Sequence, residues 1–148
     1  MTIKQRLTDA MKESMRNKDK GTLTTIRLLI DRVQKKEKDA MRDLTEEEVV
    51  QVLQTFKKQV DEEAESFAMI GNAERTAGLL NDIELIRSFL PRQMTREEIQ
   101  VVVVDVTEGL LSSGQVPNKG LVMKNLMPLV KGKADNKLVN EVVTETLK

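Results

Sequence analysis

The apolar residues of this chain recur at steps of three and four residues, and this spacing constrains the fold more than any other feature of the sequence. Apolar side chains at that period share one face of an α-helix, which can be buried against a neighbouring helix. The valines at positions 101–104 have strand propensity, but the cap before them and the later Val106 and Leu110 favour a helix. The pattern therefore predicts an all-α fold.

Capping signals and chain breaks divide the pattern into seven predicted helices. Pro91 closes the fourth helix, Pro128 is expected to kink or shorten the sixth, and Asp135 is the expected N-cap of the seventh. Three pairs have the spacing of a capping box: Thr2 with Gln5, Thr45 with Glu48, and Thr95 with Glu98. We expect helices at residues 2–15, 23–33, 45–70, 79–90, 95–112, 118–130 and 135–147, the second fading into the polar stretch 34–43.

The predicted helices fall into two groups that meet near residues 91–95. Four come before this boundary and three shorter ones follow it. We therefore expect an amino-terminal four-helix bundle over residues 1–91 and a small three-helix module over residues 92–148.

The residue types that are absent exclude much of enzyme chemistry. The chain has no Cys and no His, so it offers no thiol or imidazole for catalysis and no Cys or His ligand for a metal. The Gly-rich phosphate-binding, dinucleotide-binding and nucleophile-elbow motifs are also missing. The acidic runs at 46–48 and 61–65 suit solvated helix faces. We therefore predict no catalytic residue, no metal and no cofactor.

No apolar run approaches the length of a membrane span, and the amino terminus lacks the apolar block of a secretory signal. We therefore expect a cytoplasmic protein without a membrane partner.

The net charge of zero conceals a gradient along the chain. Residues 1–42 contain 12 basic and 6 acidic residues, residues 43–91 contain 4 and 11, and residues 92–148 contain 8 and 7. The basic first hairpin could bind phosphate, or it could neutralise the acidic third and fourth helices by packing against them. The sequence leaves these two interpretations open.

A sharper concentration of positive charge lies between residues 118 and 137. Asp135 is the only acidic residue there, and Gly120 and Gly132 lie in the same stretch. Ammonium groups beside glycines suit contact with a polyanion, although a solvated face is the alternative. The five lysines are Lys119, Lys124, Lys131, Lys133 and Lys137.

The same segment carries a resemblance to known proteins. Residues 131–136 read Lys-Gly-Lys-Ala-Asp-Asn, and Leu-Val-Asn follows at 138–140. This run resembles the tail of the B subunit of the glutamine-dependent aspartyl/glutamyl-tRNA amidotransferase and the free-standing YqeY family, which shares the module. The resemblance to YqeY extends over the chain, at residues 7–18, 23–28, 45–48 and 89–93. Asn136 stands where the family usually has glycine, and asparagine tolerates the left-handed conformation.

The resemblance implies a helical bundle followed by a tail module that contacts tRNA, with amide chemistry carried out by other subunits. On that basis Lys131 and Lys133 neutralise phosphates, while Gly132 permits close approach of the backbone. Asp135 and Asn136 cap the last helix. The remaining predicted roles are a wider RNA footprint for Lys119, Lys124 and Lys137, and for Asn140 a tie between the turn and the last helix.

The leading prediction is thus a non-catalytic, tRNA-binding accessory protein. One alternative is a protein-interaction module that docks on a tRNA-processing or aminoacylation enzyme, such as a tRNA synthetase or an amidotransferase component. The other is an amidotransferase-related carbon–nitrogen ligase with glutamine as amide donor, an association that rests on kinship alone because no residue of the chain visibly supports it.

Overall fold

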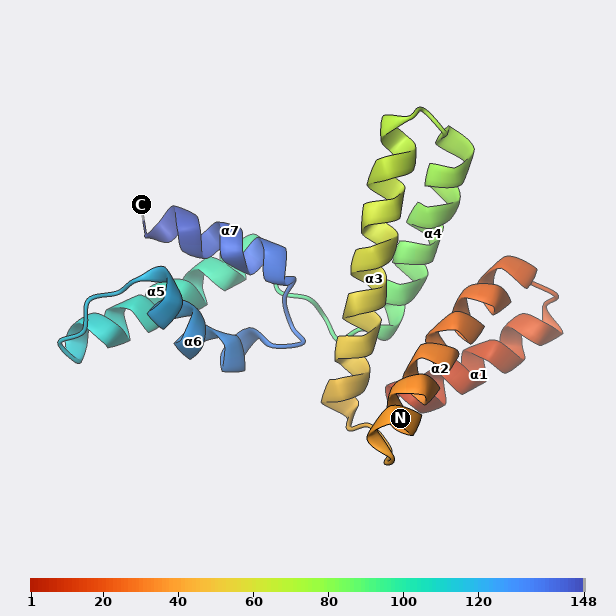
Figure 1. Ribbon diagram of the computed structural model, residues 1–148, viewed down its shortest axis with the longest axis horizontal. Helices are drawn as coiled ribbons and strands as arrows, with labels where there is room; N and C mark the ends of the chain where they lie inside the picture. The colour runs from red at the N-terminus through yellow and green to blue at the C-terminus, as the bar shows by residue number, and fades with distance from the viewer. Residues whose placement is uncertain (148) are drawn as a thin grey trace. The chain divides into compact units, whose positions relative to one another are not determined.

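The computed structural model describes residues 1–147, and within that range it contains seven α-helices and no β-strand. The predicted all-α fold is therefore confirmed. None of the helices within this range is long and apolar enough to cross a membrane. The helices shown in Figure 1 are α1 (Ile3–Arg16), α2 (Lys20–Ala40), α3 (Glu46–Met69), α4 (Ala73–Phe89), α5 (Arg96–Ser112), α6 (Lys119–Val130) and α7 (Asn136–Thr146).

Local capping explains where several helices begin. The predicted capping boxes at Thr2 and Thr45 are confirmed, with both reciprocal hydrogen bonds present. At α5 the Thr95 hydroxyl accepts the N–H of Glu98 at 3.2 Å, while the Glu98 carboxylate accepts from the Arg92 guanidinium at 2.6 Å. Each of these threonines satisfies an N–H group that the first helical turn leaves without a partner.

Helix α2 is longer than the apolar pattern predicts at both ends. It begins at Lys20, because the Asp19 carboxylate accepts the N–H of Thr22 and so serves as the N-cap. The reversal from α1 occurs at Lys18, which has a left-handed φ of 56°. At the other end the helix continues to Ala40 through a polar stretch rich in Lys, Gln and Glu, which are good helix formers.

Pro128 does not end α6. The helix continues to Val130, and Pro128 lies in its last turn. The expected shortening before the proline is therefore absent. The hydrogen bond that proline cannot donate is missing only near the helix end, and the N–H of Lys131 still donates to the Met127 carbonyl at 2.9 Å.

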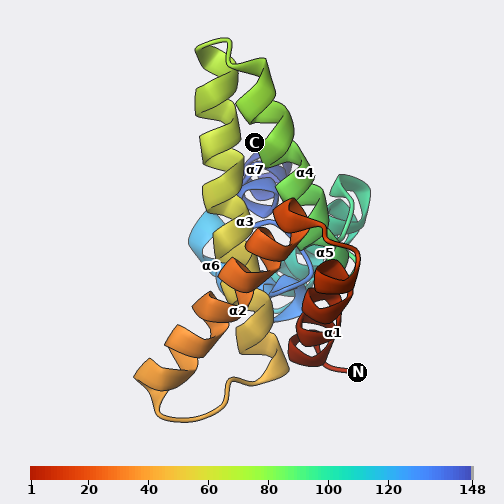
Figure 2. The same cartoon turned by 90° about the vertical axis from the view of Figure 1, so that its right-hand side faces the viewer.

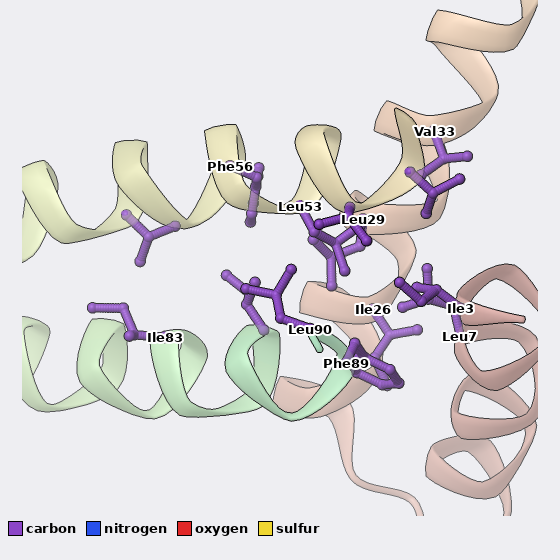
Figure 3. Packing of buried hydrophobic residues seen from close by; sticks show 14 of the residues in the cluster. Ile3, Leu7, Ile26, Leu29, Val33, Leu53, Phe56, Ile83, Phe89 and Leu90 are labelled. Carbon is purple, nitrogen blue, oxygen red and sulfur yellow. The ribbon is translucent and has the colours of Figure 1, made fainter. Parts of the chain in front are cut away.

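The chain divides into two compact units, Met1–Pro91 and Arg92–Lys148. In the first unit, α3 and α4 extend as a two-helix arm beyond α1 and α2 (Figures 1 and 2). Where all four helices meet, Ile26, Leu29 and Leu53 are completely buried. Figure 3 shows these side chains from α2 and α3 facing Ile3 and Leu7 of α1 and Phe89 at the end of α4. This shared core fixes the two hairpins against each other.

A polar contact secures the end of α4 to α1. The Arg6 guanidinium donates to the carbonyl oxygens of Ser88 and Phe89 at 2.7 and 3.3 Å, and it lies 5.5 Å from the centre of the Phe89 ring. Carbonyls in the last turn of a helix lack intrahelical partners, so a cation there is favourable. Arg6 is therefore a structural residue of the first unit.

The second unit has its own core, formed where α5, α6 and α7 meet. Its fully buried members come from all three helices and include Ile99 of α5, Leu126 of α6 and Val139 of α7. Val103 is also fully buried, whereas Val101 of the same valine run is 61% exposed. The run is thus split between the two faces of a helix, as the helical period requires. The buried residues are Ile99, Val103, Leu110, Val122, Leu126, Val130, Ala134, Val139, Val142 and Val143.

The ion pair at the start of α3 predicts a pH dependence of stability. Two Arg42 nitrogens donate to the two carboxylate oxygens of Glu48 at 2.8 and 2.9 Å, and this pairing, with the N–H of Thr45, lowers the Glu48 pKa to about 2. A lowered pKa stabilises the folded state above pH 4.5, and the contribution is lost as the pH falls from 4.5 towards 2.

We therefore expect the stability of Glu48→Gln to fall less steeply than that of the wild type in this acidic range. Urea unfolding followed by circular dichroism at several pH values measures the difference. Parallel curves for the two proteins would show that Glu48 titrates normally.

Candidate nucleic-acid interface

The lysine-rich segment predicted from the sequence lies along α6, the following turn and the start of α7. Lys119 is the first residue of α6, Lys124 lies within it, and Lys131 is its C-cap residue. Lys133 is in the turn and Lys137 is the second residue of α7. All five residues are exposed.

The turn between α6 and α7 is held firmly by its backbone. The Lys133 carbonyl accepts the N–H of Met94 at 2.7 Å, and the Gly132 carbonyl accepts from the Gln93 amide at 3.3 Å. The Lys133 N–H donates to the Val130 carbonyl at 2.9 Å, and Ala134 is only 4% exposed. The carbonyls of Gly132 and Lys133 are thus hydrogen-bonded within the unit, and Ala134 is buried. The side chains of Lys131 and Lys133 are therefore exposed on a loop whose backbone is fixed. We name residues 131–137 the lysine turn.

Glycine at position 132 has a conformational reason. Its φ of 76° is in the left-handed region, where a side chain costs about 1–2 kcal/mol. The left-handed residue of this turn is thus Gly132, whereas Asn136 has no positive φ and is the first residue of α7. Asn136 therefore does not adopt the left-handed conformation that asparagine tolerates.

The acidic and amide residues of the motif make local contacts. Asp135 is the N-cap of α7, where its carboxylate accepts the N–H of Lys137 at 2.9 Å. The Asn140 amide donates to the Asn136 carbonyl one turn earlier, at 3.0 Å. These contacts fix the first turn of α7, and Asp135 places one negative charge within the lysine turn.

The other charges of this unit are largely paired among themselves. Arg92 pairs with Glu98, and Arg96 pairs with Glu141 and Glu145. Within residues 1–147 no recorded ion pair involves Lys119, Lys124, Lys133 or Lys137. These four ammonium groups therefore remain available for an external anion.

The structure gathers some of the predicted residues and separates others. Lys131, Lys133 and Lys137 share the lysine turn, so their backbones are close together. Lys119 is at the opposite end of α6, about 18 Å away along the helix axis, and Lys124 lies between. A ligand that contacts all five must be at least that long, as a nucleic-acid backbone is.

Other kinds of site receive less support from the described part of the chain. Among residues 1–147 no three acidic side chains gather in a way that could hold a metal ion. The three phenylalanines of the sequence all precede residue 92, and there is no Trp or Tyr. The unit that carries the lysine turn therefore has no aromatic side chain on which a base could stack.

A comparison with protein-family models decides the family of the chain. Residues 4–147 match the model described as Yqey-like protein, which is nearly the entire sequence. The chain belongs to the YqeY family. No curated protein matches it.

In this YqeY protein the sequence did not reveal what positions the lysine turn. Gln93 and the backbone of Met94 hold the carbonyls of Gly132 and Lys133 from 39 residues away in sequence. Gln93 falls within residues 89–93, which resemble the family, but nothing in that stretch indicates a contact with Gly132. A pairing between two loops that are distant in sequence has no periodicity, so it emerges only from the fold.

Proposed function

We propose that this YqeY protein is a non-catalytic tRNA-binding accessory protein and that the lysine turn is its main contact with RNA. The observation that carries the proposal is the set of exposed lysines on a loop whose backbone is anchored inside the unit. A loop that is already ordered loses little conformational freedom when it binds. The resemblance of the same residues to an amidotransferase tail module favours tRNA as the polyanion.

In this proposal Lys131 and Lys133 neutralise adjacent phosphates, and Lys137 adds a third contact from α7. Lys119 and Lys124 extend the footprint along α6. Without aromatic side chains in the unit, recognition depends on the shape and backbone of the RNA rather than on stacked bases.

In this proposal the two units are domains of different types. We propose that residues 1–91 form the YqeY amino-terminal four-helix domain and residues 92–148 a three-helix domain of the amidotransferase-tail type. The proposal includes no chemical step, since the kinship to carbon–nitrogen ligases brings no catalytic group to this chain. It places the protein in the cytoplasm, with tRNA.

The salt dependence of tRNA binding tests this function. Three to five lysine–phosphate contacts predict a slope of log K against log salt of about −2 to −4.5. We expect labelled total tRNA to bind the full chain and to lose affinity about 20- to 500-fold when salt rises fourfold. Absence of binding at low salt, or binding that is insensitive to salt, would refute the proposal.

A second function is favoured by a separate observation. Met69 and Ile70, at the tip of the α3–α4 arm, are 88% and 74% exposed. Adjacent exposed apolar side chains at a projecting turn suit docking on another protein, here a tRNA-processing or aminoacylation enzyme. Co-purification with such an enzyme that survives nuclease and is lost in Met69→Ser/Ile70→Ser would support this function over RNA binding alone.

A further inference from the structure

One face of α2 carries a line of basic side chains that the lysine turn does not explain. Its four members are exposed and are spaced by seven, eight and three residues: Lys20, Arg27, Lys35 and Lys38. At 100° per residue these positions fall on one side of the helix, along about 27 Å of its length. The opposite side contains Ile26, Leu29 and Val33, which are buried in the core of the first unit. We call the four residues the α2 ridge.

The ridge stands out because many other basic residues of this unit already have partners. Lys4 pairs with Glu37, Arg42 with Glu48, Lys57 with Asp61, and Arg87 with Glu84. Arg6 and Arg75 lie over phenylalanine rings, and Arg32 lies over Phe56 and donates to Gln59. Within residues 1–147 no recorded ion pair involves a residue of the ridge.

In the part of the chain that the structure describes, the α2 ridge also forms no recorded ion pair with the acidic helices α3 and α4. The recorded ion pairs between residues 1–42 and the acidic segment after them are Arg42–Glu48 and Lys4–Asp43, both near the start of α3. The ridge faces away from the core, and Asp31 is the acidic residue on the same side. Asp39 lies one turn after Lys35 at the edge of this side, so four cations and two anions leave a local charge of +2.

We propose that the α2 ridge is a second binding surface for the phosphate backbone of RNA, on a different unit from the lysine turn. The identity of the partner rests on the proposed function, whereas the residues are independent of it. A straight row of cations on a rigid helix suits a polyanion that extends in one direction. An anionic membrane is a poorer fit, because the apolar face that would enter the lipid is buried in the core.

Two surfaces on one chain strengthen each other when the same RNA reaches both. Once one surface has bound, the second contact is intramolecular. Its effect on the overall affinity then depends on the effective concentration of the RNA at the second surface. The ridge is therefore expected to raise the affinity and steepen the salt dependence without adding sequence preference.

The test compares variants of the full chain in titrations of labelled total tRNA. The ridge variant is Arg27→Ala/Lys35→Ala, since alanine preserves the helix and neither side chain is in the core. The matched control is Lys12→Ala/Lys58→Ala, which removes the same charge from exposed sites on α1 and α3, outside the ridge. We expect the ridge variant to bind about threefold to tenfold more weakly, with the magnitude of the salt slope reduced by about 2.

The outcomes separate this inference from the proposed function. Weaker binding of the ridge variant but not of the control supports the ridge, whatever happens in the lysine-turn variant Lys131→Ala/Lys133→Ala. Weaker binding of the lysine-turn variant alone refutes the ridge and leaves the proposed function intact. An equal effect in the ridge and control variants refutes a specific ridge, because it reports net charge only. Binding to vesicles of anionic phospholipid that depends on Arg27 and Lys35, without binding to tRNA, would also overturn the proposal.

Discussion

Replacement of Leu126 by alanine is expected to destabilise the second unit strongly and to leave the stability of the first unchanged. Leu126 of α6 is fully buried in the core that α5, α6 and α7 share, so its truncation should cost about 2–5 kcal/mol. A unit of about 57 residues has a total stability of only about 3–9 kcal/mol. One substitution therefore removes a large part of what holds the lysine turn in place.

Hydrogen exchange measured by mass spectrometry resolves this effect along the chain. Peptides from residues 92–147 should lose protection in Leu126→Ala, and peptides from residues 1–91 should not. Leu129→Ala is the matched control, because Leu129 is on the same helix but 53% exposed and should cost little. Loss of protection throughout both units would contradict the separate stability of the two cores.

The double substitution Lys131→Ala/Lys133→Ala is expected to weaken tRNA binding about tenfold. Each exposed ammonium–phosphate pair contributes up to about 1 kcal/mol, so the two together change Kd by at most about 30-fold, and about tenfold corresponds to about 0.7 kcal/mol for each pair. The magnitude of the salt slope should fall by about 2, because each lysine removed leaves one phosphate without its ammonium partner. Titration of labelled total tRNA at two salt concentrations gives both quantities.

The fold around these residues should survive, since both lysine side chains are exposed and the backbone contacts of the turn do not need them. A circular dichroism spectrum and an unfolding midpoint equal to those of the wild type would verify this. Lys12→Ala/Lys58→Ala removes an equal charge elsewhere and should bind as the wild type does. If Lys131→Ala/Lys133→Ala bound tRNA with unchanged affinity and an unchanged salt slope, the lysine turn would not be the RNA-binding site.

The helices could be predicted because their signals are local. The capping boxes at Thr2 and Thr45 depend on residues three positions apart, and the apolar period depends on neighbours within two turns. The prediction was less accurate for α2, where residues 34–40 are helical through propensity without an apolar stripe. The predicted start at residue 23 was also too late, because the Asp19 cap begins α2 at Lys20.

The candidate site could be predicted only in its composition. The sequence shows the five lysines and Gly132 but not that Gln93 and Met94 hold the carbonyls of the turn. It also suggested a left-handed role for Asn136, whereas Gly132 adopts that conformation. The α2 ridge is equally hidden, since its spacing stands out only when the buried face of the helix is known. Contacts between distant segments and the direction of a face both require the fold.

Mapping of tRNA contacts by nuclear magnetic resonance tests the central claim most directly. Full-length protein labelled with ¹⁵N is titrated with total tRNA, and the amide signals are followed residue by residue. The largest changes are expected at residues 131–137, with further changes along α6 and on the α2 ridge. Changes confined to the α3–α4 tip at residues 69–72, with the lysine turn unaffected, would contradict that claim.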